Sequence, residues 1–551
     1  MGNQNAKSKQ VRSDRGQPDR GRKSFWTWGW EADEPTQAQR RETAKHLSQL
    51  YGQEVTAPEI PDIESFELRA TRISVPDTLS DVVTTDKSER VIHTYGGHFL
   101  ELNKAIRGEF EEPPDAVAYP GSEQELEAVL DWCDGKGYAA IPYGGGTTVV
   151  NGVSIPGTVD GAVTIDMERF NQVLEIDDVS RAARVQAGIF GPDLESDLRP
   201  GGFTLRHFPQ SFPWSTLGGW IVTRSGGHYA TNHTHIDDFV ESIRMITPQG
   251  WWESRRLPGS GAGPSPDRMV IGSEGTLGIL TEAWMRIQKR PVFRATAGVV
   301  FPTWEAAYTA TRHIVQAKLW PANLRLLDPA EAGRAAGLDG KQALLIIGFE
   351  SAELPQGELI KLAVGIARDS GGLISDDEIL ISDGSGETTG RDGAVGNWRS
   401  SFIGVNAGLT NGLGLIGDTF ESAVTWDKWP EFDAEIRDKV GKVLKEVIGD
   451  AHSLSCRFTH VYTDGPAPYY TFSGMGKKGG QEEQWQAIKN AASEVLISAG
   501  GTITHHHAVG RMHAEGWSKQ RPDLFETALR ATKKSLDPNS ILNPGVLFQP
   551  D

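Results

Sequence analysis

The sequence predicts an α+β fold, in which helices and strands are mixed along a chain of two or three domains or subdomains. Of the 551 residues, 38% are hydrophobic, which is enough to form a sizeable core. A chain of this length is too long for one domain. Segments with helical spacing of apolar residues alternate with short apolar runs typical of strands. One pair of runs, RMITPQGWWES at 244–254, contains the turn residues PQG and predicts an antiparallel hairpin.

The composition restricts the partners and the compartment. The formal net charge of −18 argues against nucleic acid, because neutralising phosphates requires clustered Lys and Arg. No run approaches the ~18 apolar residues of a membrane-spanning helix. Cys133 and Cys456 are the only cysteines and give no disulfide framework. We therefore expect a cytoplasmic protein with a small-molecule or lipid substrate, and leave open a peripheral membrane contact and a homodimer.

The first 24 residues predict a disordered basic tail, since they are polar and contain seven Lys or Arg against two Asp. Weak attachment to an anionic membrane surface is the alternative role for such a tail. The four aromatic residues of FWTWGWEADEP, at 25–35, then predict an anchor for a helical extension over 25–110. This extension contains the helix PTQAQRRETAKHLSQLYG at 35–52.

From residue 111 the spacing predicts a helix, a strand and then a glycine-rich loop. GSEQELEAVLDWCDGKG, at 121–137, begins with a capping box of Ser122 and Glu125 and ends at glycines. YAAIP, at 138–142, is the buried strand that follows it. Four further strands are expected at AVTIDM (162–167), AARVQAG (182–188), ESIRMITP (241–248) and GILTEAWMRIQ (278–288).

The rest of the chain mixes helices with strands. QWQAIKNAASEVLISAGG, at 484–501, predicts an amphipathic helix that a glycine pair ends. PDLFETALRATKKSLDPNSILNPGVL, at 522–547, predicts a helix and then an extended strap.

Three glycine- and hydroxyl-rich stretches carry the chemistry. IPYGGGTTVVNGV, at 141–153, offers consecutive backbone N–H groups that suit phosphate oxygens, although a plain turn is the alternative. HFPQSFPWSTLGGWIVTRSGG, at 207–227, places two glycines inside a short helix, where each costs about 1 kcal/mol against alanine, so we expect close packing against that backbone. GSEGTLGIL, at 272–280, is the third stretch. Without a P-loop lysine among them, they indicate one large ligand with a pyrophosphate.

Together these stretches resemble the vanillyl-alcohol-oxidase family of flavoproteins, whose FAD-binding fold is called PCMH-type. Within that family the sequence is most similar to the branch of alkyldihydroxyacetone-phosphate (alkylglycerone-phosphate) synthases and their bacterial relatives. THHHAVGR, at 504–511, resembles the triple-histidine strand of this branch. The resemblance implies FAD, bound noncovalently because Thr147 and Thr148 stand where tethered members carry a histidine.

The resemblance also implies the cofactor-binding residues and the domains. The FAD segments match Pro142, Tyr143, Gly144, Gly145, Gly146, Thr147 and Thr148; Gln210, Ser211, Phe212, Pro213, Trp214, Ser215 and Thr216; Thr223, Arg224, Ser225 and Gly226; and Glu274, Gly275, Thr276, Leu277, Gly278, Ile279 and Leu280. We expect a PCMH-type two-subdomain FAD-binding domain over 111–290, an α+β cap or substrate domain with an antiparallel sheet over 291–500, and a C-terminal segment over 501–551 that returns to the FAD domain.

Catalytic residues follow from the same resemblance. Tyr469 matches the family's acid/base tyrosine, with its neighbour Tyr470 as the alternative. Because a tyrosine of ordinary pKa, about 10, is a poor base at neutral pH, it needs cationic neighbours, and the histidines His505, His506 and His507 are the expected ones. Arg325 matches a family arginine that contributes to activity.

A metal is not expected at the histidines. In a strand, consecutive side chains point to opposite faces, so at most His505 and His507 would share one. Gly412, Gly414 and Gly417 match the dinucleotide motif GxGxxG, but without a βαβ context we interpret this as a chance match.

One departure from the family bears on the substrate. The family's phosphate-binding arginine aligns with Ala407, and no Arg or Lys lies between Ser400 and Asp427. Arg399 is the nearest substitute. Three hypotheses follow: an FAD enzyme that exchanges the acyl group of acyl-dihydroxyacetone phosphate for a fatty alcohol in ether lipid synthesis; an FAD-dependent dehydrogenase or oxidase of a 2-hydroxy acid or alcohol; and a non-catalytic flavin-binding protein.

Overall fold

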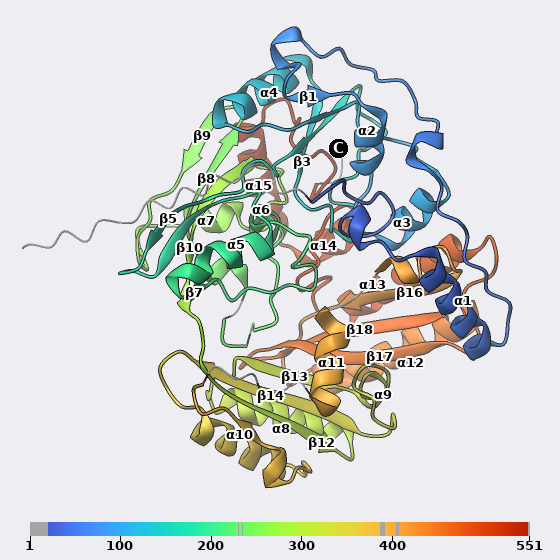
Figure 1. Cartoon of the computed structure of the whole chain (residues 1–551), viewed down its shortest axis with the longest axis vertical. Coiled ribbons are helices and arrows are strands. Elements are labelled where there is room, and N and C mark those ends of the chain that lie inside the picture. Colours follow the sequence, from blue (N-terminus) through green and yellow to red (C-terminus); the bar gives the residue numbers. More distant parts are fainter. Residues whose placement is uncertain are drawn as a thin grey trace, which may run out of the picture.

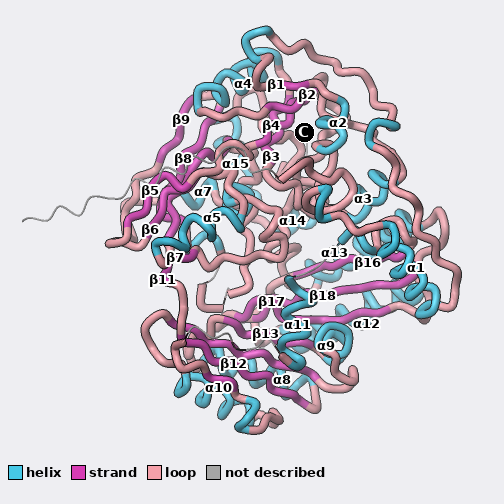
Figure 2. The backbone as a smooth tube through the Cα atoms, in the orientation of Figure 1, coloured by secondary structure: helices cyan, strands magenta, loops and turns pink. Residues whose placement is uncertain are grey.

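The computed structural model describes residues 20–548 apart from 230, 234, 386–388, 390–391 and 404–406, and only the backbone of 401–403 and 407. The α+β prediction is confirmed, since the described strands form four sheets with helices between and around them. Figure 1 shows two bodies, an upper one with the four- and five-stranded sheets and a lower one with the seven-stranded sheet. Figure 2 shows that loops make up much of the upper body.

The first sheet of the upper body leads directly into the triple glycine. It consists of β1 (Val83–Thr84), β2 (Ala116–Ala118), β4 (Ala162–Asp166) and β3 (Ala139–Tyr143), in that order. The strands β2, β4 and β3 are parallel. The predicted helix is α4 (Glu123–Lys136), and it connects β2, which was not predicted, to the predicted strand β3. The predicted capping box is half formed: the Glu125 N–H donates to Ser122 Oγ at 3.2 Å, but the Glu125 carboxylate accepts from the Gly121 N–H at 2.6 Å.

The second sheet of the upper body is antiparallel. It consists of β5 (Val173–Asp177), β6 (Ala182–Gln186), β10 (Ile279–Arg286), β8 (Val240–Thr247) and β9 (Gly250–Glu253). The predicted hairpin is β8 with β9, in which Thr247 pairs with Gly250. The smaller elements are β7 (Phe203–Thr204), which pairs with β11 (Gln288–Lys289), and the helices α5 (Gly191–Leu198) and α7 (Pro266–Val270).

In the short helix α6 (Leu217–Val222), the structure gives a reason for one of the two glycines that were expected to destabilise a helix. Thr216 Oγ1 accepts from the Gly219 N–H at 3.4 Å and caps the helix. A Cβ on Gly218 would lie 2.9 Å from the Cβ of Ala187. The expected close packing therefore exists, and at Gly218 the partner is the chain's own backbone after β6.

The lower body is one antiparallel sheet covered on both faces. Its strands are, in order, β15 (Leu380–Ile381), β12 (Phe293–Phe301), β14 (Ala343–Ser351), β13 (Asn323–Leu327), β17 (Ser453–Val461), β18 (Pro466–Met475) and β16 (Leu415–Glu421). One face packs against α8 (Trp304–Gln316), α10 (Gly357–Asp369), α12 (Trp429–Val447) and the predicted helix α13 (Gln481–Ser498). The other face packs against α9 (Pro329–Ala336) and α11 (Gly393–Ile403).

The N-terminal segment differs from the prediction. Residues 1–19 of the predicted tail lie outside the described residues, but Lys23 is only 8% exposed and ion-pairs with Asp166 at the end of β4. Residues 20–24 are thus part of the folded body, because a buried carboxylate holds the lysine. The helices α1 (Gln37–Tyr51), α2 (Lys87–Ile92) and α3 (Phe99–Ile106) follow.

The C-terminal segment returns to β3. After α14 (Ala514–Gln520) and α15 (Asp523–Leu536), the Ala140 N–H donates to Ile541 O at 2.8 Å and the Asn543 N–H donates to Ala140 O at 3.0 Å. Short 3₁₀ helices lie at Glu31–Asp33, Ile63–Ser65, Asp77–Leu79, Arg199–Gly201, Ile236–Asp238, Asp376–Glu378 and Ala407–Leu409.

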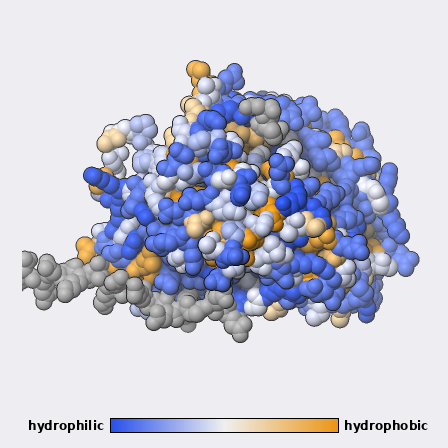
Figure 3. All heavy atoms as spheres, turned by 90° about the horizontal axis from the view of Figure 1, so that it is seen from above, coloured by the Kyte–Doolittle hydropathy of each residue, from blue (hydrophilic) through white to orange (hydrophobic). Residues whose placement is uncertain are grey.

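The molecular surface agrees with a polar, charged sequence. The face shown in Figure 3 is mostly hydrophilic, with apolar residues in small separate groups. Among the described helices, none combines the length and the apolar character that crossing a bilayer would require.

Candidate active site

The predicted glycine-rich stretches converge on one cavity of about 480 Å³. Its lining includes residues 142–148 at and after the end of β3, residues 215–216 and 218–219 at the start of α6, and residues 278–280 at the start of β10. Leu217, in the same helix, does not line it. Gln210, Ser211, Thr223, Ser225, Gly226, Glu274 and Gly275 also line it. The other predicted cofactor residues do not line this cavity, which corrects the prediction for Phe212, Pro213, Trp214, Arg224, Thr276 and Leu277.

The triple glycine is required first by the protein's own packing. A Cβ on Gly145 would lie 2.8 Å from the carbonyl carbon of Trp214 and 3.1 Å from the Cα of Ser215. Gly146 has a φ of +65°, in the left-handed region that favours glycine. We expected the absent side chains to make room for a ligand, but the loop's approach to residues 214–216 already excludes them.

This close packing leaves the loop's backbone groups available to a phosphate. No hydrogen bond within the described part of the chain uses the N–H groups of Gly144, Gly145, Gly146 or Thr147. These N–H groups and the hydroxyls of Thr147 and Thr148 fit a pyrophosphate, and the apolar residues Val222, Ile279 and Leu280 fit a flat ring system. The site therefore fits FAD.

Tyr469 and two of the three histidines lie in the same cavity as the glycine loop. Tyr469, His506 and His507 line it together with Asp418 and Thr419 of β16. The ring centroids of Tyr469 and His507 are 5.3 Å apart, and those of Tyr469 and His506 are 5.9 Å apart. This end of the cavity holds the candidate proton-transfer groups.

Tyr470 is placed on the opposite side of β18, because consecutive strand residues point to opposite faces. Its hydroxyl donates to Asp433 Oδ1 at 2.8 Å, inside the core of the lower body. Of the two tyrosines proposed as the acid/base, Tyr469 lines the cavity and Tyr470 does not, so Tyr469 is the candidate that we keep.

The protonation state of Tyr469 differs from the expectation. Burial raises its pKa to about 12, even though the guanidinium of Arg457 lies 4.2 Å from the ring centre and acts in the other direction. Burial also lowers the pKa of His505 well below its usual value and that of His507 to about 4. These two histidines are neutral at pH 7, so they supply no positive charge, and Tyr469 is a neutral phenol that can donate a proton.

The triple histidine is a bent loop and not a strand, which corrects the prediction. The backbone N–H groups of His505, His506 and His507 all donate to Glu421 Oε1, at 3.1, 2.7 and 2.7 Å. His506 Nδ1 lies 2.5 Å from Glu421 Oε2. Burial would raise the pKa of Glu421, but the neighbouring histidines hold it well below its usual value. A buried carboxylate thus fixes the shape of the whole loop.

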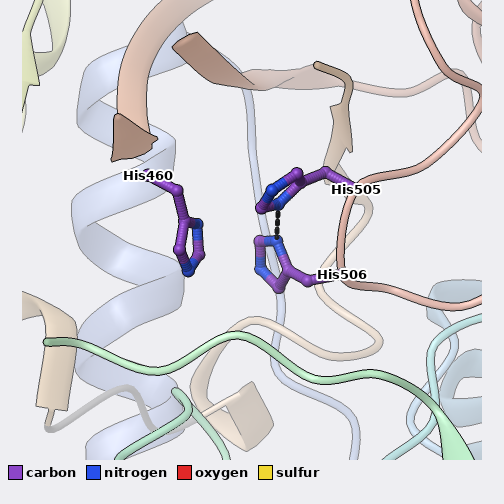
Figure 4. A group of neighbouring side chains, drawn as sticks. All are labelled: His460, His505 and His506. Atoms are coloured by element: carbon purple, nitrogen blue, oxygen red, sulfur yellow. Dashed lines mark hydrogen bonds between the residues drawn. The ribbon is translucent and has the colours of Figure 1, made fainter. Parts of the chain in front are cut away.

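Because the loop is bent, histidines that a strand would separate come together. The rings of His460, His505 and His506 face one another in Figure 4, and His505 Nδ1 lies 3.1 Å from His506 Nδ1. Their nitrogens are close enough to hold a metal ion, as are the ligand atoms of Glu421, His506 and His507. In this structure His505 and His506 bond to each other, and His505 Nε2 also lies 2.9 Å from the Tyr462 hydroxyl, whereas His460 Nδ1 bonds to Thr459 Oγ1. The absence of a metal stays a prediction.

Arg325 of β13 lies outside the lining of the cavity. It is 2% exposed, burial lowers its pKa to about 9, and its Nη2 donates to the carbonyl oxygen of His228 at 3.2 Å. Ser225 and Gly226, two residues before His228, line the cavity. Arg325 therefore acts as a positioning residue for the loop over 225–229.

Several lining residues were not predicted. Trp28, Gly97 and Asn411 line the cavity together with Asp418 and Thr419. The WGW run predicts only an anchor, and nothing in GDTFE, at 417–421, predicts that it lines the cavity. The described lining contains neither Arg nor Lys, and Ala407 lies in a 3₁₀ turn before β16. The GxGxxG glycines precede and enter a strand of an antiparallel sheet, which is not a dinucleotide-binding βαβ unit.

Comparisons with known proteins agree with the site. A family model described as FAD binding domain matches residues 114–254, and one described as FAD linked oxidases, C-terminal domain, matches residues 290–547. The chain is 29% identical over 500 residues to alkyldihydroxyacetonephosphate synthase of Dictyostelium discoideum, covering 86% of this chain and 79% of that protein. It is 26% identical over 490 residues to a glycolate oxidase subunit of Bacillus subtilis, covering 85% and 98%. A solved structure of alkyldihydroxyacetonephosphate synthase superimposes with a TM-score of 0.71 at 26% identity, covering 88% of this chain and 87% of that one.

Proposed function

The chain belongs to the FAD-linked oxidase family and is an FAD-binding flavoenzyme, and from that premise we propose that it exchanges the acyl group of an acyl-dihydroxyacetone phosphate for a fatty alcohol. The products are an alkyl-dihydroxyacetone phosphate and a free fatty acid, so the reaction needs no electron acceptor. Relatives named alkyldihydroxyacetonephosphate synthase support this choice within the family. Bound FAD would supply an electrophilic ring to the carbon at which the exchange occurs.

One observation carries the proposal: Tyr469 and the histidine loop lie at one end of the cavity that the phosphate-binding loop also lines. The glycine loop would hold the FAD pyrophosphate through its free N–H groups. The neutral imidazole of His507 would accept the proton next to the substrate carbonyl, and the Tyr469 phenol would donate a proton to the departing carboxylate. Glu421 would keep the histidines in place through their backbone N–H groups.

The proposal is tested with the flavin-loaded protein, acyl-dihydroxyacetone phosphate and a long-chain alcohol labelled with ¹⁸O. We expect an ether product that carries the label, together with unlabelled fatty acid, detected by mass spectrometry. The Tyr469→Phe variant, loaded with flavin to the same extent, serves as the control and should form no product. Absence of ether product from the wild-type holoprotein would refute the proposal.

A second function is favoured by the similarity to a glycolate oxidase subunit, which extends over 98% of that protein. In this reaction bound FAD would supply a hydride acceptor, and a neutral histidine would accept the proton of the 2-hydroxy acid. Anaerobic addition of 2-hydroxy acids would then bleach the flavin absorbance, whereas the exchange reaction leaves the flavin oxidised at the end of each turnover.

A further inference from the structure

A second cavity, of about 240 Å³, lies between the upper and lower bodies. Arg206, His228 and Tyr229 come to it from the upper body, and Arg290 and Arg294 from the connection into β12 and its start. The sheet of the lower body contributes Asn323 of β13 together with Gly348 and Glu350 of β14. Helix α11, which lies against this part of the sheet in Figure 1, contributes Trp398 and Arg399.

The lining of this second cavity is strongly basic, on a chain whose net charge is −18. Among the described lining residues, four are arginines and one has a carboxylate, Glu350, which ion-pairs with Arg206. Arg290 pairs with Glu195 outside the lining, at 3.2 Å. No hydrogen bond or ion pair within the described residues engages the guanidinium of Arg399, which is half-buried.

The arginines of this cavity affect the pKa of His228 and lie close to Tyr229. Burial lowers the pKa of His228 well below its usual value, and the charges of Arg325, Arg399 and Arg206 lower it further. The guanidinium of Arg206 lies 3.7 Å from the ring centre of Tyr229 and is held over that ring. His228 is therefore neutral at pH 7 and adds no positive charge to the cavity.

The second cavity adjoins the flavin cavity through one short loop. Ser225 and Gly226 line the flavin cavity, and His228 and Tyr229 line the arginine cavity. Two residues of extended chain span at most about 7 Å, so the two walls are close neighbours. The described lining of the flavin cavity contains no Arg or Lys. The arginine side chains nearby line the second cavity, on the other side of this loop.

We propose that the arginine cavity is an oxyanion site, which binds the phosphate or carboxylate group of a small ligand between Arg399, Arg206 and Arg290. Arginine suits this role because its planar guanidinium pairs with both kinds of anion through two parallel hydrogen bonds. The ligand's anion pairs with Arg399, whose guanidinium is engaged by no ion pair or hydrogen bond within the described residues. Binding at this site goes beyond the proposed function and does not require turnover.

The test is isothermal titration calorimetry of inorganic phosphate into the FAD-saturated protein, in which the glycine loop is already filled. We expect saturable binding to one site that weakens as NaCl is added. Arg399→Gln should weaken this binding about tenfold or more, the effect of losing a charge-assisted hydrogen bond, and Arg399→Lys should restore part of it. If Arg399→Gln folds poorly, Arg290→Gln serves as a second variant, and it should also reduce the affinity for phosphate.

The matched control is Arg255→Gln, since Arg255 is exposed and lies outside both cavities. This variant should bind phosphate as the wild type does. The proposal is overturned if wild-type holoprotein takes up no phosphate at millimolar concentrations, or if Arg399→Gln and Arg255→Gln bind it equally well.

Kinetics with the phosphorylated substrate then identify the source of the anion. If the site holds the substrate's own phosphate, inorganic phosphate competes with that substrate, and Arg399→Gln raises its KM without changing the KM of the alcohol. If the site holds a free anion, inorganic phosphate changes kcat without competing. Failure of the exchange reaction would refute the proposed function and leave the calorimetric result unaffected.

Discussion

Replacing Gly145 with alanine tests whether the glycine loop holds FAD through its fit against residues 214–216. The new Cβ would lie 2.8 Å from the carbonyl carbon of Trp214, and closer still to its oxygen. Ordinary contacts begin at 3.4 Å, so the carbonyl carbon alone requires a shift of about 0.6 Å, and the nearer oxygen requires one of more than about 1 Å. Both neighbours are backbone atoms of cavity-forming segments, so no flexible side chain can move aside.

The magnitude follows from the cost of overpacking. An extra methyl group in a well-packed site costs about 1–3 kcal/mol, and each 1.4 kcal/mol changes a dissociation constant about tenfold. If the loop relaxes when the cofactor is absent and must be forced back to bind it, the Kd for FAD rises roughly 5- to 100-fold. Titration of the apoprotein with FAD, followed by the quenching of flavin fluorescence, measures this change.

The control substitution is Gly441→Ala in α12, where no atom lies within 4 Å of the added Cβ. It should leave FAD binding unchanged and raise the free energy of unfolding by about 0.5–1 kcal/mol, because alanine favours helix interiors. Circular dichroism confirms that both variants are folded. If folded Gly145→Ala binds FAD as tightly as the wild type, the argument from loop packing is wrong.

Three further predictions concern the other parts of the site. Tyr469→Phe should reduce turnover at least about 100-fold while the FAD absorbance and Kd stay unchanged; retained turnover would place the proton donor elsewhere. Glu421→Gln should lower the free energy of unfolding by about 3–5 kcal/mol at pH 7. Because the folded-state pKa of Glu421 is lowered, its stabilisation is complete above the unfolded pKa of about 4.5 and is lost as the pH falls through the folded value, so urea unfolding should show a deficit that shrinks toward pH 3; a constant deficit would contradict this assignment. Lys23→Met should destabilise the protein by about 3–5 kcal/mol by leaving the carboxylate of Asp166 without its lysine, and the double variant with Asp166→Asn should recover part of that loss in the same assay; no recovery would show that the ion pair is not the cause.

Local patterns were sufficient to predict elements whose burial follows the period of one helix or strand. The helix α4, the strands β4 and β10 and the hairpin of β8 with β9 lie within one or two residues of their predicted limits. The glycines of α6 also predicted close packing, which is found at Gly218 against Ala187 but not at Gly219. In each case the spacing of apolar residues, or a glycine, depends on contacts of that same segment, so it can be interpreted without knowing the rest of the fold.

The predictions that failed depend on partners far away in the sequence. The histidine run looks like a strand, but three of its N–H groups turn toward Glu421 on another strand. Lys23 looks like part of a solvated tail, but its carboxylate partner is buried at the end of β4. The raised pKa of Tyr469 likewise results from burial, which no local pattern reveals.

The course of the C-terminal segment has a consequence for truncated forms of the protein. Asn543 lines the flavin cavity, and its side-chain amide donates to Glu274 O at 2.7 Å and to Gly152 O at 3.0 Å. A chain cut before residue 540 would lack this wall of the cavity, although it would keep the whole glycine loop. We therefore expect such a truncated chain to lose its yellow colour on dialysis, whereas the full chain keeps it.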